Sequence, residues 1–338
     1  MIRILDPEAI GQIAAGEVIE RPASVVKELV ENAIDAGATR IAVRVRLGGT
    51  AEIEVADDGA GIAADELALA LAPHATSKLD GADALQRIRT LGFRGEGLAS
   101  IAAVSRVRLI SRLRGVEVGT AIEAFGESIG EPEAVATPEG TRAIVRDLFA
   151  NVPVRRDYLR GPGTEFARIS TWLATIALAY PHVGFSLEHD GKPVFTFGIE
   201  DGLYTRLAHA FGRTAAQTLL PLGPHESVGL RVEGCISPPG SDRPDRRLQL
   251  LFVNGRLLRS GLLAGAWTAA YRTFTMVGRY PYGIVFLDIL PADVDPNVHP
   301  TKSDVRFRYN DHVVAAVRDA MAATLRRSAG ERLERAVS

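Results

Sequence analysis

The sequence predicts an α+β protein with two domains. Short alternating runs typical of strands are interleaved with helical patterns over residues 22–179, and a second pattern of strands and helices begins near residue 213. The chain has 338 residues, and single hydrophobic cores rarely grow beyond about 250 to 300 residues. We therefore expect a first domain at residues 1–200 and a second at residues 201–338.

A helix is expected from Pro22 to about residue 36. Proline suits the first turn because its missing N–H would have no partner there, and Gly37 is a common helix stop. The apolar positions form one stripe at roughly 100° per residue. Glu28 and Asn32 lie one turn apart on the opposite side, so we expect this helix to bury one face and to present acids on the other.

The alternating runs of the first domain predict a largely antiparallel sheet with helices on one side. A stretch of irregular pattern, residues 60–105, separates the second strand from the third, with helical pieces near 65–71 and 97–104. Loops that long inside a domain are usually functional. The expected strands are 41–47, 52–56, 107–113, 120–125 and 141–148.

Further helices and strands are expected after residue 150. A helix at 166–179, a hairpin turn at 189–192 and a helix at 201–212 precede the second domain. In that domain we expect strands at 230–236, 248–253 and 283–290, a helix at 262–271 and a final helix from residue 311.

Composition excludes several classes of protein. Cys235 is the only cysteine, so no internal disulfide forms. Asp6 and Glu8 interrupt the region where a signal peptide needs an apolar core, and no segment approaches the roughly 18 apolar residues of a membrane span. We expect a cytoplasmic protein without a membrane partner. No zinc-ligand spacing or local Ser/His/Asp arrangement occurs.

The net charge of −2 conceals an asymmetry. Residues 1–200 carry 21 Lys and Arg against 28 Asp and Glu, whereas residues 201–338 carry 18 against 13. A basic second domain is compatible with a polyanionic partner, and ordinary solvated surface charge explains it equally well.

The run Asp57–Ile62 combines acids and glycines where a strand ends. A buried Asp57 could accept a hydrogen bond from the exocyclic amine of adenine, and glycine lets the backbone approach a flat ligand. The alternative is a turn with two solvated acids.

Three glycines in the run 90–98 precede a predicted helix, where free N–H groups favour a phosphate. Thr76, Ser77 and Lys78 add two hydroxyls and a point charge upstream, although such a Thr-Ser pair is often only a helix cap. The chain has no G-x-x-x-x-G-K-[ST]. Lys302, in a loop with prolines at 296 and 300, could deliver an ammonium to a site in the other domain, or could be an ordinary surface lysine.

The order and spacing of these features resemble the ATP site of the GHKL superfamily, and further motifs resemble the MutL family of DNA mismatch-repair ATPases. The resemblance covers essentially the whole chain. It implies a GHKL (Bergerat) α/β sandwich followed by a second domain of the ribosomal-protein-like type with a left-handed βαβ unit. The motifs that carry it are residues 16–32, 92–98, 147–156, 252–256 and 297–302.

The resemblance implies roles for individual residues. Glu28 would be the general base, Asn32 would bind Mg²⁺, and Asp57 would hold the adenine amine, with Thr141 nearby through a water. Lys302 would reach the γ-phosphate, and residues 72–98 would form a lid over ATP. The other ATP-binding residues would be Gly59, Gly61, Ile62, Thr76, Ser77, Lys78, Gly92, Phe93, Arg94, Gly95, Glu96, Gly97 and Leu98.

The sequence departs from the family pattern at three positions. Asp58 stands where the family usually has Asn, which would add a negative charge close to the nucleotide. Ala150 replaces a usual Tyr, and Gly97 stands where Ala is more frequent.

By the same resemblance, ATP would drive dimerisation through an N-terminal arm at residues 1–20, and slow hydrolysis would reset the protein. The expected partners are DNA, bound with little sequence preference and strong salt dependence, a MutS-type mismatch-recognition protein and a second copy of the chain. Candidate phosphate contacts are Arg243, Arg246, Arg247, Arg256 and Arg259.

The endonuclease motif of many family members, D-Q-H-A-x-x-E-R, does not occur, so we expect ATPase activity without nicking and suspect an N-terminal fragment. Two alternatives stay open at this stage. One is a nucleotide-gated DNA clamp or scaffold with negligible turnover, and the other is the ATPase part of another GHKL protein such as a type II topoisomerase.

Overall fold

The structure is a computed structural model that describes residues 15–16, 18–72, 97–295 and 305–337. Its contacts divide the chain into two compact units, with the boundary between Gly202 and Leu203. Each unit is described by itself.

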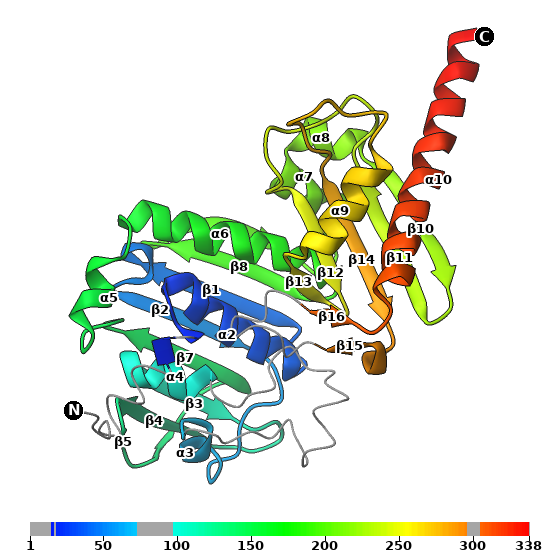
Figure 1. Cartoon of the computed structure of the whole chain (residues 1–338). Coiled ribbons are helices and arrows are strands. Elements are labelled where there is room, and N and C mark those ends of the chain that lie inside the picture. Colours follow the sequence, from blue (N-terminus) through cyan, green and yellow to red (C-terminus); the bar gives the residue numbers. More distant parts are fainter. Residues whose placement is uncertain (1–14, 17, 73–96, 296–304, 338) are drawn as a thin grey trace, which may run out of the picture. The chain divides into compact units, whose positions relative to one another are not determined.

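The first unit is built on one large sheet (Figure 1). Its strands are β1 (Arg40–Arg46), β2 (Glu52–Asp57), β3 (Arg106–Arg112), β4 (Gly119–Phe125), β5 (Ser128–Ile129), β6 (Glu133–Val135), β7 (Gly140–Arg146), β8 (Gly184–His189) and β9 (Lys192–Phe197). Their order is β5-β4-β3-β7-β2-β1-β8-β9, and β6 pairs with β4. Only β1 and β8 pair in parallel among these described strands, so the predicted, largely antiparallel sheet is confirmed.

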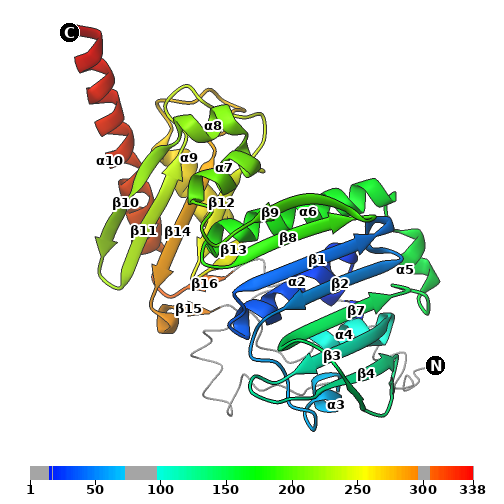
Figure 2. The same ribbon diagram turned by 180° about the vertical axis from the view of Figure 1, so that it is seen from behind.

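Three helices cover one face of this sheet, as the two opposite views show (Figures 1 and 2). They are α2 (Pro22–Asp35), α4 (Gly97–Val104) and α6 (Pro162–Ala179). Because side chains alternate along a strand, every second residue of β2 faces these helices: Ile53 and Val55 are buried there, and Asp57 follows on the same side. The smaller helical elements are η1 (Leu47–Gly49), α3 (Leu67–Ala70) and α5 (Pro153–Asp157).

The other face of the sheet is held by charge pairs across strands. Glu54 on β2 is 7% exposed and receives Arg44 of β1 at 2.5 Å and Arg142 of β7 at 2.9 Å. Burial raises the pKa of Glu54, but the hydrogen bonds and charges of the two arginines outweigh it and hold that pKa below its ordinary value. The carboxylate therefore stays ionised and ties three strands together.

The second unit has a five-stranded sheet. Its strands are β10 (Leu220–Ser227), β11 (Leu230–Ile236), β12 (Gln249–Val253), β13 (Arg256–Leu258) and β14 (Gly283–Ile289), and its helices are α7 (Leu203–Phe211), α8 (Arg213–Thr218), α9 (Gly261–Ala270) and α10 (Asn310–Val337). The strand order is β10-β11-β14-β12-β13. A short turn η3 (Pro291–Asp293) and a small ribbon of β15 (Val294–Asp295) with β16 (Arg306–Phe307) complete the unit.

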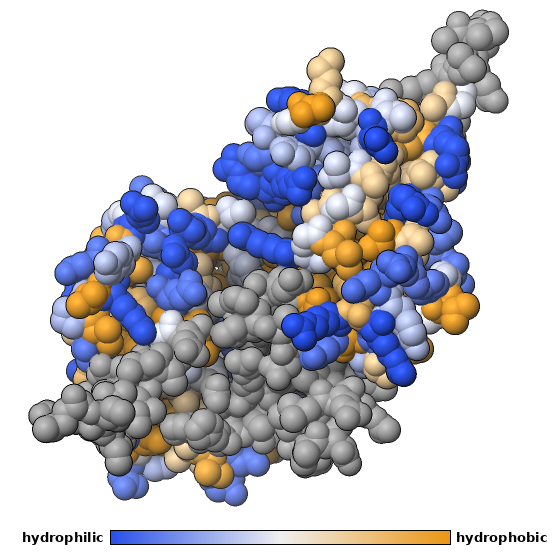
Figure 3. Space-filling model, viewed as in Figure 1, coloured by the Kyte–Doolittle hydropathy of each residue, from blue (hydrophilic) through white to orange (hydrophobic). Residues whose placement is uncertain are grey.

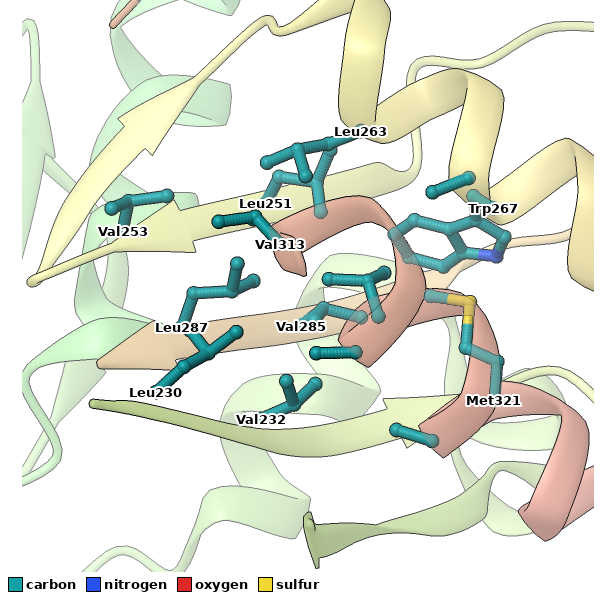
Figure 4. Close-up of a cluster of buried hydrophobic side chains, with 14 of the residues drawn as sticks. Leu230, Val232, Leu251, Val253, Leu263, Trp267, Val285, Leu287, Val313 and Met321 are labelled. Atoms are coloured by element: carbon teal, nitrogen blue, oxygen red, sulfur yellow. The ribbon is translucent and has the colours of Figure 1, made fainter. Parts of the chain in front are cut away.

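The core of this unit lies where α9 and α10 cover one face of the sheet (Figure 4). Trp267 of α9 and Met321 of α10 are fully buried there together with Val285 of β14. Strands β12 and β14 pair in parallel, and the chain between them runs through β13 and α9, so the unit contains a βαβ connection.

The structure confirms most predicted elements to within one or two residues. Helix α6 begins at Pro162, four residues before the predicted start, because a proline in the first turn serves as the start signal there. Strand β10 was not predicted. It contains Pro221 and Pro224, which argue against a strand in sequence, but proline is tolerated at the edge of a sheet, where β10 lies.

Apolar side chains are also found on the surface. Figure 3 shows polar residues (blue) over much of the described part of this face, with apolar residues (orange) between them. Single exposed apolar side chains of this kind are normal in folded proteins.

Candidate functional site

Helix α2 places Glu28 and Asn32 one turn apart. Pro22 begins the helix, and the N–H of Ala36 closes it on the carbonyl of Asn32 at 2.9 Å. Gly37 follows with φ of 71°, a conformation that favours glycine. The helix therefore ends one turn after Asn32.

The predicted exposed acidic face of this helix is wrong in one respect. Glu28 is only 9% exposed and Glu31 only 8%. Helix α2 packs against α6, α4 and the sheet, so its polar side lies in a crowded interior. An acid so enclosed is more typical of a functional site than of a solvated surface.

Asp57 ends β2 on the face that α2 covers. Its Oδ1 atom accepts hydrogen bonds from the backbone N–H of Gly59 at 2.8 Å and of Thr141 at 3.3 Å. None of the hydrogen bonds from the described residues goes to Oδ2. Burial raises the pKa of Asp57 above its ordinary value despite the two bonds, and the charge of Asp58 adds to this shift. The carboxylate is thus anchored by one oxygen and presents the other.

A row across three neighbouring strands forms the floor of the site. Asp57 of β2 pairs with Thr141 of β7, which pairs with Ser111 of β3. The Ser111 hydroxyl donates to the carbonyl of Gly140 at 2.9 Å and accepts from the N–H of Ile62 at 2.8 Å. It also lies 3.0 Å from the Thr141 hydroxyl, so one buried serine fixes the predicted positions 62 and 141 together.

Sequence reasoning did not find Ser111 or Gly140. Ser111 is 1% exposed in a strand of otherwise alternating apolar residues, and a lone polar residue at a core position of a strand is the signal that could have revealed it. Gly140 has φ of 107°, and a Cβ there would lie 2.0 Å from the carbonyl oxygen of Asp57. Only glycine lets β7 approach the acid-glycine turn this closely.

The acid-glycine turn is fixed at both ends by backbone bonds. The N–H of Ala60 donates to the carbonyl of Ala36 at the end of α2, and its carbonyl accepts from Arg114 after β3. Gly61 has φ of 76°, and a Cβ there would lie 2.2 Å from the Arg112 carbonyl oxygen. The predicted Gly59, Gly61 and Ile62 are therefore held beside Asp57 by the helix and by β3.

Asp58 uses its carboxylate within the fold. Its Oδ1 accepts from the N–H groups of Thr39 at 2.7 Å and Arg40 at 2.8 Å, and its Oδ2 accepts from the Thr39 hydroxyl at 2.6 Å. Burial alone would raise its pKa, but these hydrogen bonds dominate and lower it. Both oxygens are thus used to fix the start of β1.

Helix α4 begins next to Glu28. A Cβ built on Gly97 would lie 2.9 Å from the Glu28 Oε2 atom and 3.6 Å from its Cβ, so the carboxylate packs directly against the first residue of α4. Leu98 follows in the same turn. The structure thus brings Gly97 of α4 against Glu28 of α2. The neighbouring row on the sheet is formed by Asp57, Gly59, Gly61, Ile62 and Thr141.

The remaining predicted site residues lie outside the described residues. They are Thr76, Ser77, Lys78, Gly92, Phe93, Arg94, Gly95, Glu96 and Lys302. Most of the predicted N-terminal arm at residues 1–20 and most of the predicted lid at 72–98 also lie outside the described residues.

The predicted DNA contacts lie in the second unit, where two loops are paired. The backbones of Arg243 and Tyr280 exchange hydrogen bonds of 2.7 and 2.8 Å. The guanidinium of Arg243 lies over the Tyr282 ring at 5.1 Å and that of Arg246 over the Tyr280 ring at 4.7 Å. Arg247 is instead bound to an acid, Asp245, at 2.5 Å. The other two candidates are Arg256 in β13 and the exposed Arg259 after it.

Within the described residues, no three His, Cys, Asp or Glu side chains are grouped closely enough to hold a metal ion. Of the described residues at this site, Asn32 could offer a carboxamide oxygen to a metal, and Mg²⁺ commonly completes its shell with ligand oxygens and waters. In the part of the chain that the structure describes, no helix is long and apolar enough to cross a membrane.

Comparison with known proteins identifies the class of the first unit. Residues 19–124 match the family described as histidine kinase-, DNA gyrase B- and HSP90-like ATPase. The crystal structure of the N-terminal domain of a DNA repair protein has the same fold, with a TM-score of 0.78 and 24% identity over 94% of this chain and 98% of that one. The protein has a GHKL-type ATPase domain.

Further matches extend over the second unit. Residues 207–326 match the family described as DNA mismatch repair protein, C-terminal domain. The ATPase domain of Aquifex aeolicus MutL complexed with ADP has a TM-score of 0.61 and 25% identity, covering 89% of this chain and 98% of that one. The DNA mismatch repair protein MutL of Xanthomonas oryzae pv. oryzae is 46% identical over 96% of this chain.

The chain belongs to the MutL family and corresponds to its N-terminal ATPase region. It spans about half of that relative, since the match covers 52% of the Xanthomonas protein.

Proposed function

We propose that this chain binds ATP and hydrolyses it slowly to ADP and phosphate as part of DNA mismatch repair. The observation that carries the proposal is the Asp57 carboxylate, which is half-buried, held through Oδ1 by the N–H groups of Gly59 and Thr141, and open at Oδ2 to a hydrogen-bond donor. The exocyclic amine of adenine is such a donor, whereas the carbonyl of guanine would meet a carboxylate with no proton between them. The ATPase domain of Aquifex aeolicus MutL, which was solved with ADP, supports the same ligand class.

Glu28 is the proposed general base. Its carboxylate lies in a site with little exposure, one helical turn from Asn32 and against the first residue of α4. An acid in that position can orient a water molecule and accept its proton as the water attacks the γ-phosphate. When bound through Asn32, Mg²⁺ would supply the positive charge that the phosphates need.

The lid residues Gly92–Leu98 and Thr76–Lys78, and Lys302 of the second unit, are proposed to hold the phosphates. Their support is the sequence pattern, with glycines before a helix start and a lysine in a proline-bounded loop. If Lys302 contacts the γ-phosphate, the arrangement of the two units depends on whether ATP is intact. ATP binding would then favour dimerisation through the N-terminal arm, and hydrolysis would release it.

DNA, a MutS-type mismatch-recognition protein and a second copy of the chain are the proposed partners, and the bacterial cytosol is the proposed compartment. DNA binding is supported by the net positive charge of residues 201–338 and by Arg243 and Arg246, whose guanidinium groups lie over tyrosine rings. Such groups contact phosphates without reading base sequence.

The test compares two variants with the natural chain. Asp57→Asn keeps the Oδ1 acceptor and replaces Oδ2 by an amide that would face the adenine amine donor to donor, so we expect ATP affinity to fall at least about a hundredfold. Glu28→Ala should keep ATP binding and lose phosphate release. Calorimetric titration with a non-hydrolysable ATP analogue, a phosphate-release assay and size exclusion are the measurements.

Unchanged hydrolysis in Glu28→Ala would remove Glu28 from the chemistry. Dimerisation by the analogue without measurable turnover in the natural chain would favour a nucleotide-gated clamp over an enzyme. Hydrolysis that depends on DNA supercoiling would point to a topoisomerase-like role.

A further inference from the structure

The segment Asp147–Asn151, between β7 and α5, is part of a family motif that the proposed ATP chemistry leaves without a role. Its backbone is unusual: Asp147 has φ of 55° and Phe149 has φ of 62°. A positive φ is rare for residues other than glycine and costs free energy for a bulky side chain. Phe149 is also completely buried, so the surrounding structure holds the segment in this form.

The strained segment caps the C-terminal end of α4. The N–H of Phe149 donates to the carbonyl of Val104 at 2.7 Å, and the side-chain amide of Asn151 donates through Nδ2 to the carbonyl of Ala103 at 2.8 Å. These carbonyls belong to the last turn of the helix, where no partner exists within the helix itself.

Two further bonds complete the cap. The N–H of Gly126, in the turn after β4, donates to the carbonyl of Ala102 at 2.8 Å. The Ser105 hydroxyl donates to the carbonyl of Ile101 at 2.5 Å. Four consecutive carbonyls, from Ile101 to Val104, therefore receive hydrogen bonds from four different donors, and this end of α4 is fixed along the helix axis.

The opposite end of α4 is Gly97, which packs against the Glu28 carboxylate. The helix has eight residues and is therefore about 12 Å long. Five of them, Ala99, Ser100, Ile101, Ala102 and Val104, are buried. A short, buried helix moves as one piece, so a shift at Ala103 is passed on to Gly97 and to the space available to Glu28.

We propose that Asn151 and the strained Phe149 backbone are positioning elements for ATP hydrolysis, which set the place of α4 and through it the place of the Glu28 carboxylate. The inference rests on the proposed role of Glu28 as general base. Asn151 acts through the helix, by its hydrogen bond to the Ala103 carbonyl. Its Oδ1 atom is buried and accepts no hydrogen bond within the described residues, an unfavourable environment for an amide. The Nδ2 donor to α4 is what justifies an asparagine at this position.

The test uses three substitutions of Asn151. Asn151→Asp is nearly isosteric but replaces the donor by an oxygen and places a negative charge at the negative end of the helix dipole. Asn151→Ala removes the whole carboxamide, and with it the donor, without adding a charge, and it is measured instead of Asn151→Asp if that variant fails to fold. Asn151→Gln retains an amide donor on a side chain one methylene longer and should recover part of the activity.

If Asn151 only stabilised the fold, its loss would lower the melting temperature, and it would not lower kcat while leaving ATP affinity unchanged. We expect kcat of the Asp and Ala variants to fall about tenfold to a hundredfold, as misplacement by about 1 Å can cause, while the Kd of a non-hydrolysable ATP analogue changes less than threefold. Phe195→Leu on β9, at the other edge of the sheet from β4, is the control: it should lower the melting temperature and leave kcat unchanged.

A kcat in Asn151→Ala equal to that of Phe195→Leu would overturn the inference, and so would an equal loss of kcat and ATP affinity. The Glu28→Ala variant, measured in parallel, separates the two proposals. If it retains hydrolysis, the role of Glu28 fails; if it loses hydrolysis while the Asn151 variants keep theirs, only the positioning role fails.

Discussion

The Oε2 atom of Glu28 lies against Gly97, close to the place where a side chain on that residue would begin: a Cβ on Gly97 would be 2.9 Å away. The absence of a side chain at position 97 therefore lets the carboxylate approach the first turn of α4. The contact joins two segments that are 69 positions apart in the sequence. It also makes the position of the proposed base depend on a helix that is fixed at its far end.

Gly97→Ala and Gly97→Val should have different effects on turnover. Alanine raises helix stability by up to about 1 kcal/mol relative to glycine, and the end of a glutamate side chain can move by a few tenths of an ångström. We expect Gly97→Ala to raise the melting temperature and to change kcat by less than about threefold. The two extra methyl groups of valine would displace the carboxylate, and we expect kcat to fall at least about tenfold. Phosphate release and thermal unfolding are the measurements.

Gly163 offers a matched control for these variants. It also lies in the first turn of a helix, α6, and a Cβ there would meet nothing within 4 Å. Gly163→Ala and Gly163→Val should leave kcat unchanged. If Gly97→Val behaves like Gly163→Val, the contact with Glu28 does not matter for turnover.

Asp57 should make the protein less stable at neutral pH. Burial raises its folded-state pKa above the unfolded value, so the folded state holds the proton more tightly, and ionisation at higher pH destabilises the fold. Asp57→Asn removes the half-buried charge and keeps the Oδ1 acceptor. We expect this variant to melt at a higher temperature than the natural chain at pH 7, even though it loses ATP binding.

The sign of this effect can be checked by its pH dependence. The stability gain of Asp57→Asn should be present above the folded-state pKa of Asp57 and should shrink as the pH falls through it, because the natural carboxyl then becomes neutral as well. Thermal unfolding without nucleotide at several pH values measures it. A variant less stable than the natural chain at pH 7 would show that the two hydrogen bonds outweigh burial.

The local elements of the site could be predicted from the sequence, but the side-by-side order of the strands that form it could not. The Pro22 start, the Gly37 stop and the end of β2 at Asp57 follow from residue preferences over a few positions. Ser111 becomes a neighbour of Asp57 and Thr141 only through the strand order β3-β7-β2, which joins segments far apart in the chain. Pairing of that kind leaves no local signal, because a strand specifies which face is buried and not which strand lies beside it.

The burial of Glu28 was missed for a related reason. Helical periodicity separates apolar from polar positions and assigns the polar ones to solvent. In the structure a second and a third helix crowd α2, and their number and placement are a tertiary property. The strained backbone at Phe149 likewise has no sequence signature, since positive φ is expected at glycine and not at phenylalanine.

Asp58 should contribute to stability and not to nucleotide affinity. Its pKa is lowered by hydrogen bonds from Thr39 and Arg40, although burial opposes the shift. The stabilisation is therefore present above the unfolded-state pKa and is lost as the pH falls through the folded-state value. Asp58→Ala should lower the free energy of unfolding at pH 7 by about 1 kcal/mol, a figure typical of lost hydrogen bonds near a surface.

Asp58→Asn is the matched control, because an asparagine can accept both N–H groups on Oδ1 and donate to the Thr39 hydroxyl. It should recover most of the stability, and both variants should bind an ATP analogue within about threefold of the natural chain. A large change in nucleotide affinity in Asp58→Asn would mean that the negative charge acts on the nucleotide after all.

DNA binding should respond differently to two neighbouring arginines. Arg246 is exposed and lies over the Tyr280 ring at 4.7 Å, which leaves the edge of its guanidinium for a phosphate. Arg247 is bound to Asp245 through both side-chain and backbone hydrogen bonds, so its charge is already balanced. If the paired loops contact DNA, Arg246→Ala should weaken binding to all sequences alike and reduce the slope of log K against log salt by about 1. Arg247→Ala should change that slope much less.

Arg318→Ala on α10, where the arginine pairs with Asp319, is the control for a general loss of positive charge. Titration of a labelled duplex at several salt concentrations measures all three. Equal slopes for Arg246→Ala and Arg318→Ala would exclude a phosphate contact at Arg246, because the charge change is the same in both variants.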